Sequence, residues 1–175
     1  MLTLRTPGPG DEDVTRAAQA ALQAEGFGFG CAAPDERWSD FLTRLERDRR
    51  GLDLPPGWVP ATLLYADVDG RVVGQSSVRH VLSEQLLRIG GHIGYAVLPA
   101  FRRRGYATEI LRQSLVVARA AGVGRALVTC DDDNLGSIAV IERCGGRRDA
   151  EWPGDDGVRH RHVDLVGVHP HQAIQ

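Results

Sequence analysis

The stretch "AFRRRGYATEI", residues 100–110, decides the fold of this chain. It joins the strand-like run "HIGYAVLP", residues 92–99, to an amphipathic helix that begins at Gly105. A helix N-terminus carries unpaired N–H groups and a partial positive charge, so a strand that turns directly into a helix makes an anion site. Glycine lets an anion approach the backbone closely. The three residues before it, whose guanidinium donors suit phosphate oxygens, are Arg102, Arg103 and Arg104. The alternative interpretation is a solvated turn in which these arginines bind nothing.

The hydrophobic pattern predicts strands alternating with helices on both sides of this stretch. Asp69 and Gly70 form the two-residue pair that a type I′ hairpin requires. The glycine-rich run "GFGFGC" follows a helix and lacks phosphate-loop spacing, so it is expected to be a helix-ending loop. The expected elements are strands at 2–6, 92–99, 125–131, 147–152 and 158–166, a hairpin within 61–81, and helices at 11–26, 38–49, 105–122 and 131–146. Such an order implies an α/β fold with antiparallel hairpins.

Composition limits the function classes. At 175 residues and 42% apolar content, the chain has the size of one domain. A formal charge of -2 gives no general electrostatic case for nucleic acid or an acidic membrane. Three widely spaced cysteines without a CxxC pair, a start unlike a signal peptide and no span-length apolar run favour a cytoplasmic protein. No lysine is present, which excludes a lysine nucleophile.

Two motifs resemble those of the GNAT superfamily of N-acetyltransferases. "RRRGYA", residues 102–107, matches the (Q/R)-x-x-G-x-(G/A) signature of that family. "NLGSIAVIERCGG", residues 134–146, resembles its N-x-x-(A/S)-x-x-x-Y-E-x-x-G-F element. The resemblance covers residues 61–150 well and the N-terminal third only by arrangement. The run "VRHVLSEQLLRIGGHIGY" further resembles one subgroup of acetyltransferases with a GGHIGY strand.

The resemblance implies a fold and a cosubstrate. The expected fold is a GNAT-like mixed sheet of six to seven strands, with a V-shaped splay between two central parallel strands and about four flanking helices. A single domain would span 1–166, with a disordered tail at 167–175. Acetyl-CoA would enter the splay and pair with a strand edge. The residues expected to bind it are Ala96, Val97, Arg102, Arg103, Arg104, Gly105, Tyr106, Ala107, Thr108, Asn134 and Ser137.

The implied reaction is direct transfer of acetyl from sulfur to a primary amine of a small molecule or protein, without a metal. A main-chain N–H near Val97 would hold the developing oxyanion. The amine needs a base, and His92 is the first candidate, followed by His80 and Glu84. Each has a competing structural interpretation, because a histidine at a strand end is commonly a hydrogen-bonded structural residue.

One departure from the family pattern concerns the leaving group. Ile141 stands where the family often has a proton-donating tyrosine. Tyr106, Tyr95 or a water would then donate the proton, or CoA would leave as a thiolate. The same departure motivates an alternative, a non-catalytic acyl-CoA-binding or regulatory module. A nucleotide-binding domain of another kind is a third interpretation, although both of its usual glycine motifs are missing.

The remaining expectations concern partners. His160 and His162 would share a strand face, but no further ligands are fixed near them, so no metal is expected. Acidic side chains such as Asp35, Glu36 and Glu84 could attract a cationic amine. The chain is expected to be a monomer or a homodimer, with acetyl-CoA and an amine acceptor as its partners and neither nucleic acid nor membrane.

Overall fold

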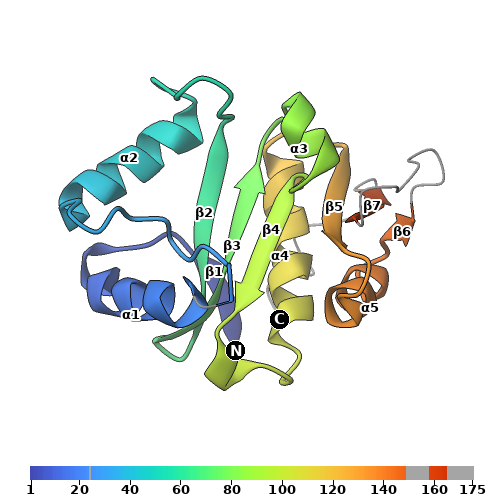
Figure 1. Cartoon of the computed structure of the whole chain (residues 1–175), viewed down its shortest axis with the longest axis horizontal. Helices are drawn as coiled ribbons and strands as arrows, with labels where there is room; N and C mark the ends of the chain where they lie inside the picture. Colours follow the sequence, from blue (N-terminus) through green and yellow to red (C-terminus); the bar gives the residue numbers. More distant parts are fainter. Residues whose placement is uncertain (24, 149–157, 165–175) are drawn as a thin grey trace.

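The hairpin at Asp69 and Gly70 forms as predicted and organises the first sheet. Both residues have positive φ, 52° and 80°, as the turn requires. The hairpin joins β2 (Ala61–Val68) to β3 (Arg71–Arg79), which pair antiparallel. Two further strands flank this pair in the order β1-β2-β3-β4 (Figure 1): β1 (Leu2–Arg5) and β4 (Ile93–Val97).

The computed structural model describes residues 1–23, 25–148 and, for the main chain, 158–164. Its second sheet has the order β5-β7-β6 and consists of β5 (Arg125–Asp131), β6 (Arg147–Arg148) and β7 (Val158–Asp164). The expected single mixed sheet is therefore corrected to two sheets, whose strand pairs in the described chain are all antiparallel. The remaining parts of the two strands expected at 147–152 and 158–166 lie outside the described residues.

Within the described residues five α-helices connect these strands, where about four were expected. They are α1 (Glu12–Gln23), α2 (Trp38–Arg50), α3 (Glu84–Arg88), α4 (Tyr106–Ala120) and α5 (Leu135–Arg143). Short 3-10 turns precede α1 and α4, at Pro9–Asp11 and Pro99–Phe101. The unexpected helix, α3, has five residues, which is too short for a helical period to show in the sequence. No helix in the described part of the chain is long and apolar enough to cross a membrane.

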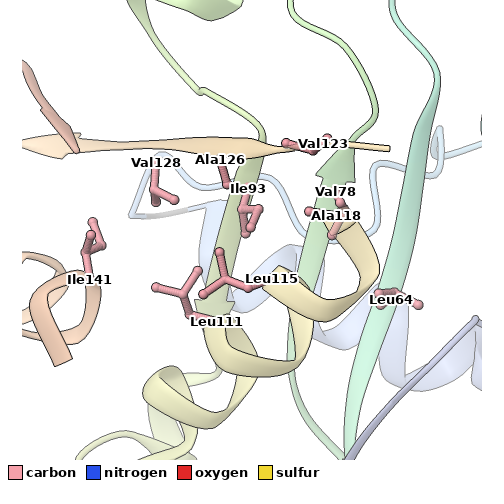
Figure 2. Packing of buried hydrophobic residues seen from close by; sticks show 10 residues of the cluster. All are labelled: Leu64, Val78, Ile93, Leu111, Leu115, Ala118, Val123, Ala126, Val128 and Ile141. Carbon is pink, nitrogen blue, oxygen red and sulfur yellow. The ribbon is translucent and has the colours of Figure 1, made fainter. Parts of the chain in front are cut away.

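The helices cover the first sheet on both faces. Leu22 of α1 packs with Tyr65 on one face, and Phe41 of α2 lies beside Leu63 on that same side. On the opposite face α4 packs against β3 and β4. Figure 2 shows the largest core cluster, in which side chains of α4 meet those of both sheets: Leu64, Val78, Ile93, Leu111, Leu115, Ala118, Val123, Ala126, Val128 and Ile141. The elements within residues 92–131, β4, α4 and β5, thus pack into one common core.

The loop between α1 and α2 is tied to β3 by one buried amide. The Gln75 side chain accepts a hydrogen bond from Gly30 N–H at 2.7 Å and donates one to Gly28 O at 2.9 Å. The run "GFGFGC" is therefore a helix-ending loop, as predicted, held over the face of the sheet that α1 and α2 cover.

Candidate functional site

Strands β4 and β5 are joined where β4 begins. His92 N–H donates to Leu127 O at 2.7 Å, and Leu127 N–H donates to Nδ1 of the His92 ring at 2.9 Å. Gly91 lies against the same residue, because a Cβ on Gly91 would stand 2.4 Å from Leu127 O. Glycine and an imidazole acceptor thus let the two backbones meet at this point.

Further along, β4 has no strand partner on its β5 side within the described chain, since each of the two strands ends its own sheet. The hydrogen bonds Arg79 N–H to His92 O and Leu98 N–H to Val73 O fix the antiparallel alternation with β3. In that alternation every second residue turns its N–H and C=O away from the neighbouring strand. Tyr95 and Val97 therefore direct their main-chain groups to the open edge.

The register also places the two predicted cofactor residues of β4. Ala96 lies opposite Gln75 and takes part in the ladder with β3, whereas Val97 faces the open edge. In agreement, Val97 O accepts a hydrogen bond from Nε of Arg102 at 3.2 Å, outside the ladder. Of the pair Ala96 and Val97, only Val97 has main-chain groups available to a ligand.

The loop before α4 is a concave array of amides. Arg103 and Gly105 both adopt left-handed conformations, with φ of 65° and 81°, and Gly105 is the N-cap of α4 with no side-chain cap. Thr108 and Glu109 donate to Gly105 O. Five successive N–H groups before them, from Arg103 to Ala107, donate to no acceptor in the described chain. Such alternating backbone conformations at a helix N-terminus bind anions.

The three arginines of this loop differ in their surroundings. The guanidinium of Arg102 forms a two-pronged ion pair with Glu25, whose pKa this hydrogen bond lowers. Nη2 of Arg104 donates to Ala100 O, and its guanidinium lies 5.7 Å from the ring centre of Phe101. Arg103 is exposed and has no partner among the described residues. Arg103 is therefore the arginine most available to an added anion.

Behind the open edge, β4 reaches the N-terminus of α5. The hydroxyl of Tyr95 lies 2.8 Å from Oγ of Ser137. Asn134 caps α5 by accepting a hydrogen bond from Ser137 N–H, which leaves its side-chain NH₂ without a described partner. Burial raises the pKa of Tyr95 to about 12, against the opposing effect of its bond to Ser137. Tyr95 is thus a neutral hydroxyl at physiological pH.

The side chain of Ile141 does not face the Tyr95 and Ser137 hydroxyls. It is fully buried in the core cluster, where Figure 2 shows its side chain directed toward Val128. The thiol of Cys144 also points into the protein: Sγ lies 3.6 Å from Thr108 O, and burial raises the pKa of the thiol. Neither residue replaces the missing tyrosine.

The three base candidates lie in different places. Nδ1 of His92 accepts the Leu127 N–H, so its lone pair is engaged. Nε2 of His80 lies 2.9 Å from Thr62 Oγ1 on β2, and burial and the charge of Arg49 lower the pKa of His80. Glu84 is exposed at the start of α3 and has no described partner. His92 thus contacts β5, His80 contacts β2, and Glu84 lies on α3.

Sequence reasoning missed Arg79 at the end of β3, next to the joint. Strand alternation could have found it, because buried Val78 faces α4 and the following residue must face the other side. Its guanidinium donates to Gly90 O and Gly91 O, both at 3.1 Å. The side chains of His160 and His162, where no metal is expected, lie outside the described residues.

A known protein family matches most of this chain. Residues 1–147 match the family model described as "Acetyltransferase (GNAT) domain". A search of curated proteins finds no match to this sequence.

Three solved structures illustrate the similarity of fold. An acetyltransferase from Agrobacterium tumefaciens is 20% identical, with 93% of this chain and 90% of that chain covered and a TM-score of 0.62. RimJ of Mycobacterium smegmatis, in complex with CoA-disulfide, is 18% identical, with 99% and 84% covered and a TM-score of 0.65. The yncA protein of Salmonella typhimurium, solved with its cofactor acetyl-CoA, is 18% identical, with 94% of both chains covered and a TM-score of 0.62.

Proposed function

Because the chain belongs to the GNAT family of acetyltransferases, we propose that it transfers an acetyl group from acetyl-CoA directly to a primary amine of a small molecule or a protein. The observation that carries this proposal is the run of five unpaired amides from Arg103 to Ala107, beside an open strand edge. Two of the similar structures contain acetyl-CoA or a CoA disulfide. Those ligands have the diphosphate and the amide-bearing arm that such a surface fits.

The diphosphate is held at the start of α4. Amides of the Arg103–Ala107 loop donate to its oxygens, and the partial positive charge of the helix terminus adds to the attraction. The exposed guanidinium of Arg103 lies on the same loop and donates to the phosphate oxygens. The structure fits this group, because the position of a Cβ on Gly105 is open space.

The thioester arm lies along β4 in a V-shaped opening between β4 and β5. Support comes from the joint at His92 and Leu127, beyond which the two strands belong to separate sheets. Amides of the arm pair with the main chain of Tyr95 and Val97, as an added strand would. The side-chain NH₂ of Asn134 donates to the arm from the α5 side.

The acetyl thioester supplies an activated carbonyl: the amine nitrogen forms a bond to its carbon, the C–S bond breaks, and the electron pair goes to sulfur. Val97 N–H points to the edge where the oxyanion develops, and it stabilises that charge. The Tyr95 hydroxyl, paired with Ser137, gives its proton to the departing sulfur and regains one from solvent.

A base must first remove a proton from the amine. The Nδ1 lone pair of His92 accepts the Leu127 N–H, so the neutral ring carries its proton on Nε2 and has no lone pair left for the amine. Nε2 of His80 is engaged with Thr62 Oγ1. Glu84 keeps a carboxylate without a described partner, and it takes the proton through water. His92 acts instead as the residue that positions the start of β4.

A non-catalytic acyl-CoA-binding module is the second candidate function. The burial of Ile141 favours it, because the usual position of the proton donor is used for the core. The experiment that separates the two functions is release of CoA thiol from acetyl-CoA with a panel of primary amines. An enzyme gives release that depends on the amine, whereas a binding module gives acetyl-CoA binding with no release above the hydrolysis rate measured without amine.

A further inference from the structure

One nitrogen of the Arg79 guanidinium, Nη1, is hydrogen-bonded within the chain, and the other two, Nε and Nη2, are not. Nη1 donates to both Gly90 O and Gly91 O, the carbonyls of the turn that leads into β4. Nε and Nη2 have no acceptor in the described chain, and they are not among its fully buried unsatisfied atoms. The edge formed by Nε and Nη2 is therefore not fully buried, and it has the geometry that donates two parallel hydrogen bonds to a carboxylate.

No carboxylate of the described chain forms an ion pair with this arginine. Burial lowers the pKa of Arg79, and no charged neighbour acts to raise it. A partly buried cation without a counterion is costly, because lost hydration is not replaced by a nearby negative charge. The two glycine carbonyls need only a neutral donor, so they do not account for an arginine at this position.

The side chain of Arg79, from the end of β3, also lies against β4, the strand that carries the proposed reaction. Its Nη1 and Nη2 stand 3.7 and 3.8 Å from the position of a Cβ on Gly94. Ile93 and Tyr95 pack on the α4 face, so Gly94 and Ala96 point to the opposite face. The Arg79 guanidinium therefore lies on this opposite face, over Gly94 in the middle of β4.

From this arrangement we infer that the acceptor is an amine that carries a carboxylate, and that Arg79 binds that carboxylate through Nε and Nη2. The inference rests on the proposed acetyltransferase function and specifies its substrate class. A strand rises about 3.3 Å per residue, so the guanidinium above Gly94 lies about 3 to 10 Å along β4 from Tyr95 and Val97. That span admits amino acids from the α-amino to the longer ω-amino type.

The test compares matched acceptors in the CoA-release assay with the whole chain. Each pair differs by the carboxylate alone: phenylalanine and phenethylamine, lysine and cadaverine, 4-aminobutyrate and propylamine. The acids are expected to have kcat/KM values about 10- to 100-fold above those of their decarboxylated partners, the usual range for hydrogen bonds to a charged group.

Arg79→Lys is the matched variant, because an ammonium group still donates to the two glycine carbonyls but has no two-pronged edge. It is expected to lower kcat/KM for the acids about 10- to 100-fold, to leave the decarboxylated amines nearly unchanged, and to keep the affinity for acetyl-CoA. Arg71→Lys, on the exposed start of the same strand, is the control and should change none of these values.

Three outcomes overturn the inference. Equal or better turnover of the decarboxylated amines by the unaltered protein contradicts it while leaving the acetyltransferase function intact. An equal loss with acids and amines in Arg79→Lys assigns that arginine a structural role. Absence of turnover with every amine removes the proposed function and the inference with it. If Arg79→Lys fails to fold, the matched pairs with the unaltered protein decide alone.

Discussion

The two ends of β4 have opposite surroundings. At the start, Gly91 and His92 bring the backbone into direct contact with Leu127 of β5. At the end, Tyr95 and Val97 turn their main-chain groups to an edge on which the described chain forms no ladder. At the start, the lack of a Cβ on Gly91 and the Nδ1 acceptor of His92 let β4 meet β5. At the end, β4 has no strand partner on that side within the described residues.

This contrast teaches how a sheet can be opened without being destabilised. Unpaired strand edges and helix ends cost free energy when they are buried. Here the unpaired groups lie together at one end, where a ligand can satisfy them, and α4 packs behind β3 and β4 along their length. The closed end holds the two sheets in place while the open end stays free for binding.

The largest effect is expected from opening the closed end. Gly91→Ala adds a methyl group 2.4 Å from Leu127 O at a residue with φ of 57°, so the backbones must separate. We expect a loss on the order of 3 kcal/mol in the free energy of unfolding, measured in urea. Gly124→Ala, which meets no atom within 4 Å and has no positive φ, is the control. A loss below about 1 kcal/mol at Gly91 would contradict the closed joint.

A smaller effect is expected from the ring of His92. His92→Ala leaves the Leu127 N–H without its acceptor and should cost about 1–3 kcal/mol of stability. His92→Asn places an oxygen near the position of Nδ1 and should restore most of the stability and the activity. If the asparagine variant is stable but inactive, His92 is the base after all, and the comparison would have to be revised.

The smallest effect, a change in kcat, is expected from the Tyr95 hydroxyl at the open end of β4. Tyr95→Phe removes the hydroxyl that meets Ser137 and should lower kcat about tenfold or less, because a thiolate is already a good leaving group. Since the pKa of Tyr95 is about 12, the ratio of the two kcat values should stay constant from pH 6 to pH 10. A ratio that falls to one in this range would show that another group donates the proton.

Much of this arrangement could be predicted from the sequence. The Asp69–Gly70 turn has the positive φ values that its pattern indicated, and the helix expected at Gly105 has that residue as its N-cap. The strand and helix order of residues 92–131 follows from periodicity. These features depend on interactions between near neighbours in the chain, which a sequence pattern records.

The parts that could not be predicted depend on distant contacts. The joint between the two sheets depends on the meeting of Gly91 and His92 with Leu127, 35 residues from His92. Whether Ala96 or Val97 faces the edge depends on register, and a shift of one residue exchanges them. The partner of Arg102, Glu25, lies 77 residues away, so the arginine stretch alone could not show which of its side chains stay free.

The central claim is that the amides at the start of α4 bind the diphosphate of acetyl-CoA, and titration calorimetry with acetyl-CoA tests it most directly. Gly105→Val and Gly122→Val form a matched pair, because both glycines have strongly positive φ, 81° and 91°, and no atom within 4 Å of an added Cβ, at opposite ends of α4. We expect the unaltered protein and Gly122→Val to bind alike, and Gly105→Val to bind at least about tenfold more weakly. Folded protein that gives no heat with acetyl-CoA, or a Gly105→Val variant with full affinity, would contradict the claim.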